Sequence, residues 1–213
     1  MRLLVTRPAG DGEATANLLR DLGHEPIVEP LLEIVFPTEE SSENEPGLGD
    51  KGDIQAFVAT SANGIRALAA HGIDPALKSV PVMAIGEASA NEARKAGFET
   101  VLIGGGTLPA LAEDIVAAFD PENGRIVYLA GKARTGDLAG LLADHGFETE
   151  TRILYEAKRK SDFSETTIRL IRSGELDGVL LFSARTAKIY SDLLHKAGLD
   201  EHGRKITCYC LSK

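Results

Sequence analysis

Short apolar segments alternate with helical patterns along the whole sequence. Residues 2–5, 54–59 and 178–182 have the apolar character of buried strands, and each is followed by a small polar turn and a helical pattern. A helix between two strands forms a crossover connection, which leaves the strands parallel and the helices over the faces of the sheet. The sequence therefore predicts an α/β fold built on parallel sheets.

Two halves of the sequence resemble each other at a nearly constant spacing. The offset is 123 residues (146 − 23) for the first matched pair of segments, 122 (183 − 61) for the second and 125 (207 − 82) for the third. The matched pairs are 21–25 with 144–148, 60–64 with 182–186, and 82–86 with 207–211. This repeat predicts two similar small α/β domains. Nothing after Lys213 matches the elements that follow Gly86, so we expect further sequence beyond Lys213 or a C-terminal domain without its last elements.

The segment 151–160 (TRILYEAKRK) is expected to form a strand that passes between the two folded bodies. Alternation would place Ile153 and Tyr155 on one face of this strand and Arg152 and Leu154 on the other. Tyr155 is the candidate catalytic residue, because a phenol that faces an inter-domain cleft can donate or accept a proton. The alternative is a half-buried strand tyrosine whose hydroxyl is satisfied by a structural hydrogen bond.

Local composition predicts two further segments. A helix is expected at residues 13–22, and residues 39–52 are acidic and rich in serine and glycine, which indicates a loop. The inward-facing residues of that helix would be Ala16, Leu18, Leu19 and Leu22.

Composition limits both the ligand classes and the compartment. The 213 residues carry a net charge of −9, which argues against a nucleic-acid interface and requires any anionic ligand to be held by local groups. No apolar run approaches the length that spans a bilayer, and the N-terminus lacks the apolar region of a signal peptide. Cys208 and Cys210 are interpreted as buried thiols of a reducing compartment. We therefore expect a soluble, cytoplasmic monomer that binds neither nucleic acid nor membrane.

The polar turns at the ends of the expected strands are the candidate binding sites. Ligands of open α/β sheets bind at the carboxyl ends of strands, and the N–H groups of helix N-termini suit anions such as carboxylates. Alternatively, each serine is an N-cap that contributes about 1 kcal/mol to its helix, and each basic side chain is simply solvated. The candidate substrate-binding residues are Arg7, Thr60, Ser61, Gly86, Ser89, Lys132, Ser183 and Arg185.

The sequence has no motif for a metal or a nucleotide. Residues 104–107 (GGGT) lack the Gly-Lys-Ser/Thr ending of a P-loop, and no G-x-G-x-x-G follows the first expected strand. The five histidines do not have the spacing of metal ligands. We therefore expect chemistry that uses no metal and no cofactor.

An ordered set of short segments resembles the uroporphyrinogen-III synthase family. The segments follow one another in the family's order from residue 1 to the end of the chain, and together with the internal repeat they carry the resemblance. They are 5–8 (VTRP), 60–64 (TSANG), 84–89 (AIGEAS), 129–132 (LAGK), 154–156 (LYE) and 182–184 (FSA).

The resemblance implies a domain organisation. Two α/β domains would be joined by two linker strands, with the active site in the cleft between the domains. The first domain would comprise residues 1–34 and 159–213, apparently without its last elements. The second would comprise residues 38–150, and the linker strands residues 35–37 and 151–158.

The resemblance also implies a reaction. The family closes hydroxymethylbilane, a linear tetrapyrrole with eight carboxylates, to uroporphyrinogen III, with inversion of the last pyrrole ring and loss of water. This step of tetrapyrrole and heme biosynthesis uses no cofactor or metal. Tyr155 matches the family's hinge tyrosine, the proposed acid for the leaving hydroxyl, and a phenol with a pKa of about 10 keeps its proton at neutral pH. Asn63 departs from the pattern of the family, many members of which carry a basic residue there.

Two other functions stay open at the level of the sequence. A non-catalytic two-domain module that binds an anionic small molecule would use the same turns, but would leave the isomer ratio of a tetrapyrrole product unchanged. A structural or regulatory relative on the same fold would have no affinity for tetrapyrroles.

Overall fold

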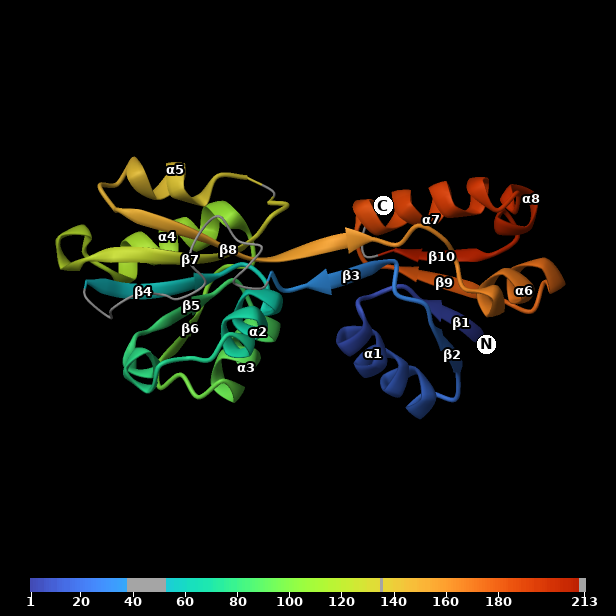
Figure 1. Cartoon of the computed structure of the whole chain (residues 1–213), viewed down its shortest axis with the longest axis horizontal. Helices are drawn as coiled ribbons and strands as arrows, with labels where there is room; N and C mark the ends of the chain where they lie inside the picture. The colour runs from blue at the N-terminus through green and yellow to red at the C-terminus, as the bar shows by residue number, and fades with distance from the viewer. Residues whose placement is uncertain (38–52, 135, 211–213) are drawn as a thin grey trace. The chain divides into compact units, whose positions relative to one another are not determined.

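The computed structural model of the chain describes residues 1–37, 53–134 and 136–210 (Figure 1). The loop expected at 39–52 lies outside these residues. Contacts within the chain divide it into two compact units, one of Met1–Ile34 with Lys158–Lys213 and the other of Val35–Ala157. The domain boundaries, linker strands and cleft expected from the sequence stay predictions.

The unit that contains both ends of the chain is built on a four-stranded sheet with the order β10–β9–β1–β2. All three strand pairs are parallel, as the sequence predicts. Leu4 and Val179 of the central strands pack with Ile189 of a covering helix in one apolar core. The strands are β1 Arg2–Val5, β2 Glu25–Val28, β9 Gly178–Leu181 and β10 Thr207–Cys210, and the helices are α1 Ala9–Asp21, α6 Glu165–Ser173, α7 Ala184–Lys196 and α8 Asp200–Gly203.

The other unit is built on a sheet with the order β3–β8–β7–β4–β5–β6, in which the pairs from β8 to β6 are parallel. Two strands, β3 and β8, continue across the boundary between the units. The strands are β3 Leu32–Val35, β4 Ile54–Ala59, β5 Val82–Ala84, β6 Val101–Ile103, β7 Arg125–Gly131 and β8 Thr149–Arg159. The helices are α2 Ala62–Ala70, α3 Glu87–Lys95, α4 Leu108–Ala118 and α5 Leu138–Ala143, with short 3-10 helices η2 Pro75–Ser79 and η3 Pro121–Asn123.

This larger sheet is covered by helices on both faces (Figure 1). Side chains alternate along each strand, so Phe57 and Val127 enter the core beneath α2 and α3, whereas Val58 and Tyr128 enter the core beneath α4 and α5. Strands buried on both faces read as nearly continuous apolar runs, which is why the sequence marks them clearly.

The repeat in the sequence is also a repeat of strand order and register. The order β5–β4–β7–β8 in one unit corresponds to β10–β9–β1–β2 in the other. Leu3 pairs with Pro26, and Ile126 pairs with Thr149, so both partners are shifted by the same 123 residues (126 − 3 and 149 − 26). The two units are therefore similar α/β folds, as the sequence predicts.

Helix α1 begins at Ala9, earlier than the expected residue 13. Ser61 and Ser183 act as N-caps for α2 and α7, which is the alternative that the sequence left open for these serines. The Ser61 and Ser183 hydroxyls accept hydrogen bonds from the backbone N–H groups of Asn63 at 3.2 Å and Thr186 at 3.1 Å. Helix α1 has no side-chain cap.

The expected inward face of α1 was partly wrong. Leu18 and Leu22 are 66% and 72% exposed, whereas Ala16 is fully buried. Gly12 is also buried in α1, and a Cβ on it would lie 3.0 Å from a methyl carbon of Val28. The helix therefore approaches the sheet through small residues, and the side chains of Leu18 and Leu22 are exposed to solvent.

The expectation of buried thiols was also wrong. Cys208 and Cys210 are both exposed, because β10 is the edge strand of its sheet within the described residues. An edge strand has a neighbour on one side only, so the apolar character of β10 does not lead to burial.

A buried carboxylate joins the end of β2 to the start of α6. Glu29 is 2% exposed and accepts hydrogen bonds from the Lys160 ammonium and from the hydroxyls of Ser164 and Thr167. Burial by itself raises the pKa of Glu29, but these hydrogen bonds and the charge of Lys160 outweigh it and lower the pKa below the ordinary glutamate value. Glu29 is therefore ionised, and it fixes the N-cap of α6.

Replacing this carboxylate should destabilise the fold. We expect Glu29→Gln to lower the free energy of unfolding by about 1–3 kcal/mol, because an amide turns two N–H donors toward groups that are themselves donors. In the wild type, the contribution of ionised Glu29 is present above the ordinary glutamate pKa of about 4.3 and is lost as the pH falls through the lower folded pKa.

Urea unfolding followed by circular dichroism, from neutral to strongly acidic pH, would measure both effects. Glu33→Gln is the matched control, because Glu33 is exposed on β3. Equal unfolding midpoints for Glu29→Gln and the wild type at neutral pH would contradict the role of this carboxylate.

Candidate active site

A pocket of about 380 Å³ lies where β4, β5 and β7 end in the unit of Val35–Ala157. Parallel strands present their carboxyl ends at one edge, so polar residues from separate turns meet there. The volume is in the range of small-molecule sites. The lining residues are Thr60, Ser61, Ile85, Gly106, Thr107, Leu108, Tyr128, Gly131, Ala133, Arg134 and Tyr155.

Tyr155 reaches this pocket because β8 carries a β-bulge. Ile153 pairs with Ala130 and Tyr155 pairs with Gly131, which leaves Leu154 as an extra residue. The expected alternation was therefore wrong: Leu154 is buried, and Tyr155 packs against the same apolar cluster. A bulge turns the following side chain away from the direction that regular alternation would give it.

The ring of Tyr155 lies directly against the backbone of Gly131. A Cβ on Gly131 would be 2.6 Å from the Cζ atom of Tyr155 and 3.0 Å from its hydroxyl oxygen. No side chain fits in that space, so glycine at this position determines where the phenol lies.

The environment keeps the Tyr155 phenol protonated. Burial raises the pKa of Tyr155, a hydrogen bond with Ser61 opposes this, and the nearby Tyr128 phenol adds to the rise. The net direction is upward from the ordinary value, so at neutral pH the phenol is a neutral proton donor.

Three of the sequence-predicted site residues meet in this pocket, namely Thr60, Ser61 and Tyr155. Two others lie outside its lining: Gly86 is the N-cap residue of α3, and Ser89 is buried in the first turn of that helix.

Lys132 directly follows Gly131, and its ammonium lies 3.4 Å from a carboxylate oxygen of Glu156. Its backbone N–H donates to the carbonyl of Tyr155 at 2.9 Å. The main chain of Lys132 thus helps to hold β8 beside the end of β7, whereas its side chain is exposed.

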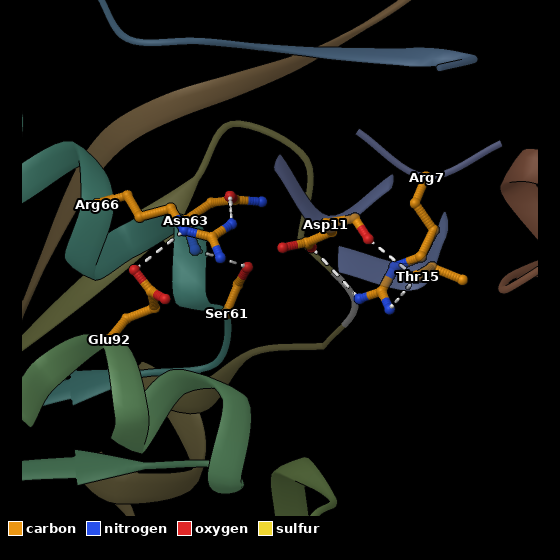
Figure 2. Close-up of polar contacts among 7 residues, drawn as sticks. All are labelled: Arg7, Asp11, Thr15, Ser61, Asn63, Arg66 and Glu92. Atoms are coloured by element: carbon orange, nitrogen blue, oxygen red, sulfur yellow. Dashed lines mark hydrogen bonds and ion pairs between the residues drawn. The ribbon is translucent and has the colours of Figure 1, made fainter. Parts of the chain in front are cut away.

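The first unit carries the other three predicted residues. Figure 2 shows the guanidinium of Arg7 held by Asp11 at 3.3 Å and Thr15 at 3.4 Å. The same guanidinium lies 4.8 Å from the ring centroid of Phe182, which is a cation–π geometry. Arg7 is therefore fixed in place before any ligand binds.

Ser183 and Arg185 lie at the start of α7. Ser183 is the N-cap, and its hydroxyl also lies 2.8 Å from the hydroxyl of Thr186. Arg185 is exposed in the first turn of this helix.

The second turn of α2 carries a cation, Arg66, that was not among the predicted site residues. Arg66 donates to the Asn63 side-chain oxygen at 3.1 Å, and its Nε atom lies 3.2 Å from Glu92 (Figure 2). Burial by itself raises the pKa of Glu92, but Lys95 and Arg66 outweigh it and lower the pKa. The positive charge that Asn63 itself lacks is thus present one turn further along the helix.

Tyr128 and Gly131 are among the lining residues of the pocket that were not predicted as site residues. Tyr128 lies in the middle of a buried apolar strand, and Gly131 looked like part of a turn. Only the pairing of β7 with β8 brings Gly131 under the ring of Tyr155, so no local signal could have found it.

The described residues contain neither a candidate metal site nor a candidate membrane-spanning helix. No group of three or more His, Cys, Asp or Glu side chains is arranged to hold a metal ion there. None of the helices in the same ranges has the length and apolar character needed to cross a membrane.

The matches to known proteins indicate one family. The family model described as Uroporphyrinogen-III synthase HemD matches residues 13–213. A search of curated proteins found no match.

Two solved structures share the fold. A uroporphyrinogen-III synthetase from Helicobacter pylori is 16% identical with a TM-score of 0.59, and the match covers 100% of this chain and 92% of that one. A mutant uroporphyrinogen III synthase from Thermus thermophilus is 18% identical with a TM-score of 0.56, and the match covers 99% of this chain and 84% of that one. Because the family model matches nearly the whole sequence, this chain belongs to the uroporphyrinogen-III synthase family.

Proposed function

We propose that this chain cyclises hydroxymethylbilane to uroporphyrinogen III, with inversion of the last pyrrole ring and loss of water. The family match over residues 13–213 is the observation that carries this function. A protonated phenol in a pocket that could take part of this substrate is consistent with it. Neither the family match nor the solved structures support the alternative of a non-catalytic binding module.

Tyr155 is the proposed proton donor. Its phenol protonates the terminal hydroxyl of the substrate, and electrons from the adjacent pyrrole nitrogen expel that group as water and leave an azafulvenium cation. When the phenol becomes a phenolate, the Ser61 hydroxyl can donate a hydrogen bond to it, since both side chains line the pocket and Ser61 already lowers the pKa of Tyr155.

The remaining steps conserve the proton. The substituted carbon of the last pyrrole attacks the azafulvenium cation to form a cationic spiro intermediate, which fragments and re-closes with that ring reversed. Re-closure removes a proton from a ring carbon, and this proton returns to the Tyr155 phenolate. The net reaction therefore releases only water, and one acid–base group is sufficient.

The predicted binding residues are proposed to hold the carboxylates of the substrate. Arg7, Lys132 and Arg185 would supply local positive charge on a chain of net charge −9. Hydroxyls or backbone N–H groups would come from the other candidates, which are Thr60, Ser61, Gly86, Ser89 and Ser183. Ser89 is buried, so its contribution would have to be made through its main chain.

We further propose a cytoplasmic monomer that uses no cofactor or metal and binds neither nucleic acid nor membrane. These proposals rest on the composition, on the sequence motifs and on the chemistry of the family.

The direct test is the ratio of type III to type I uroporphyrinogen formed from hydroxymethylbilane. The substrate also cyclises unaided to the uninverted type I isomer. The rate of this spontaneous reaction therefore serves as the reference in the assay. Mostly type III product is the expected outcome. Type I product at the spontaneous rate would overturn the proposed function and favour the binding module.

Removing the phenol hydroxyl should slow the chemical step. We expect Tyr155→Phe to lower kcat by about a hundred- to a thousand-fold with a smaller change in KM, because acid catalysis acts only in the transition state. In the wild type, the alkaline fall in kcat should lie above the ordinary phenol pKa of about 10. It should be absent from the residual activity of the variant.

Tyr209→Phe is the matched control. This substitution also removes a phenol hydroxyl, and the Tyr209 side chain is exposed on β10. A wild-type kcat in Tyr155→Phe would exclude an essential phenol.

A side chain at position 131 should lower activity by displacing the ring of Tyr155. We expect Gly131→Ala to lower kcat by about ten- to a hundredfold, because the new Cβ displaces the ring and misplaces the donor. In the double variant Gly131→Ala/Tyr155→Phe, kcat should be no lower than in Tyr155→Phe alone.

Steady-state kinetics of the type III product would test this non-additivity. Gly10→Ala is the control, because a Cβ there meets nothing within 4 Å. Additive losses in the double variant would show that Gly131 does not act through the phenol.

A further inference from the structure

Tyr128 has no role in the function described so far. It lies in the middle of β7 and is only 6% exposed, with its ring in the apolar core beneath α4 and α5. It pairs with Val58 on β4 and with Thr151 on β8. On these facts alone Tyr128 is an ordinary core tyrosine.

Its hydroxyl, however, leaves the core and enters the pocket. The Tyr128 oxygen lies 2.8 Å from the hydroxyl oxygen of Thr60, and both residues line the pocket. Two hydroxyls carry two protons, and the hydrogen bond between them uses one. Whichever oxygen is the donor, one O–H of the pair stays available to a ligand.

The Tyr128–Thr60 pair lies beside the proposed acid. Thr60 and Ser61 are consecutive, and both line the pocket together with Tyr128 and Tyr155. The Tyr128 phenol is near enough to Tyr155 to raise its pKa. These four residues thus bring two phenols and two aliphatic hydroxyls to the pocket.

The internal repeat shows that the fold does not require the Tyr128–Thr60 pair. In the other unit, the residue in the register position of Tyr128 is Val5, since Val58 pairs with Tyr128 and Leu180 pairs with Val5. The sequence counterpart of Thr60 is Phe182, 122 residues later (182 − 60). Val5 is fully buried, so an aliphatic side chain fills the same place in the same fold.

We propose that Tyr128 is a positioning residue of the reaction, which orients the Thr60 hydroxyl so that the pair presents one donor to a carboxylate of the substrate. This inference rests on the proposed function. Arg134 lines the same pocket and supplies a positive charge, which makes an anionic acceptor the suitable partner. Tyr155 would then act on the leaving hydroxyl, while Tyr128 would act on binding.

This division of roles predicts different kinetic effects for the two phenols. A carboxylate bound equally in the ground state and the transition state affects KM and leaves kcat unchanged. Loss of one hydrogen bond to a charged group corresponds to about a tenfold change in binding. We therefore expect Tyr128→Phe to raise KM for hydroxymethylbilane by about five- to twentyfold, with kcat within about twofold of the wild type.

The test is a double-mutant cycle on the full chain with hydroxymethylbilane as substrate. Tyr128→Phe, Thr60→Val and the double variant should raise KM by similar factors, because the two residues supply one donor between them. Thr60→Ser keeps the hydroxyl and should restore a KM near that of the wild type. Tyr209→Phe, which removes the hydroxyl of an exposed tyrosine that does not line the pocket, should leave both constants unchanged.

The outcomes are distinguishable. A merely structural Tyr128 would give a lower melting temperature and a smaller active fraction at unchanged KM, and that result would overturn the inference. Multiplicative increases of KM in the double variant would also overturn it, since the residues would then act separately. Spontaneous type I product from the wild type would overturn the proposed function, and this inference with it.

Discussion

The approach of the Tyr155 ring to the backbone of Gly131 is the contact on which the candidate site depends. The ring can lie across β7 only because position 131 has no side chain. It points to the pocket only because Leu154 is an extra residue in the pairing of β7 with β8. Burial in this position keeps the phenol protonated, so the geometry and the chemistry of the proposed acid have the same origin.

The two copies of the α/β fold carry different side chains at corresponding strand ends. Both place a serine N-cap at the end of a central strand, Ser61 in one unit and Ser183 in the other. The unit of Val35–Ala157 carries the Tyr128–Thr60 hydrogen bond at this strand end, whereas the other unit holds Arg7 over the ring of Phe182. Duplication would thus supply two anion-binding strand ends, and side-chain replacement on one of them would supply the acid.

Charge in this protein is organised locally and not in bulk. The chain is acidic overall, yet Arg7 and Arg66 are each held by a polar side chain and a carboxylate, Arg7 by Thr15 and Asp11 and Arg66 by Asn63 and Glu92. Ordering these long side chains in advance reduces the entropy lost when a ligand binds. The buried Glu29 shows the opposite arrangement, in which a carboxylate is saturated by donors and serves the fold.

The sequence by itself determined the parallel α/β class, the repeat, the family resemblance and Tyr155 as the residue of interest, because these depend on periodicity and on order along the chain. It was wrong about Leu18, Leu22 and the cysteines, since burial depends on which neighbours cover a segment. Only the tertiary structure decided the bulge at Leu154, the space at Gly131 and the Tyr128–Thr60 pair. Each of these arises where strands distant in sequence lie side by side, and no local pattern encodes the register between them.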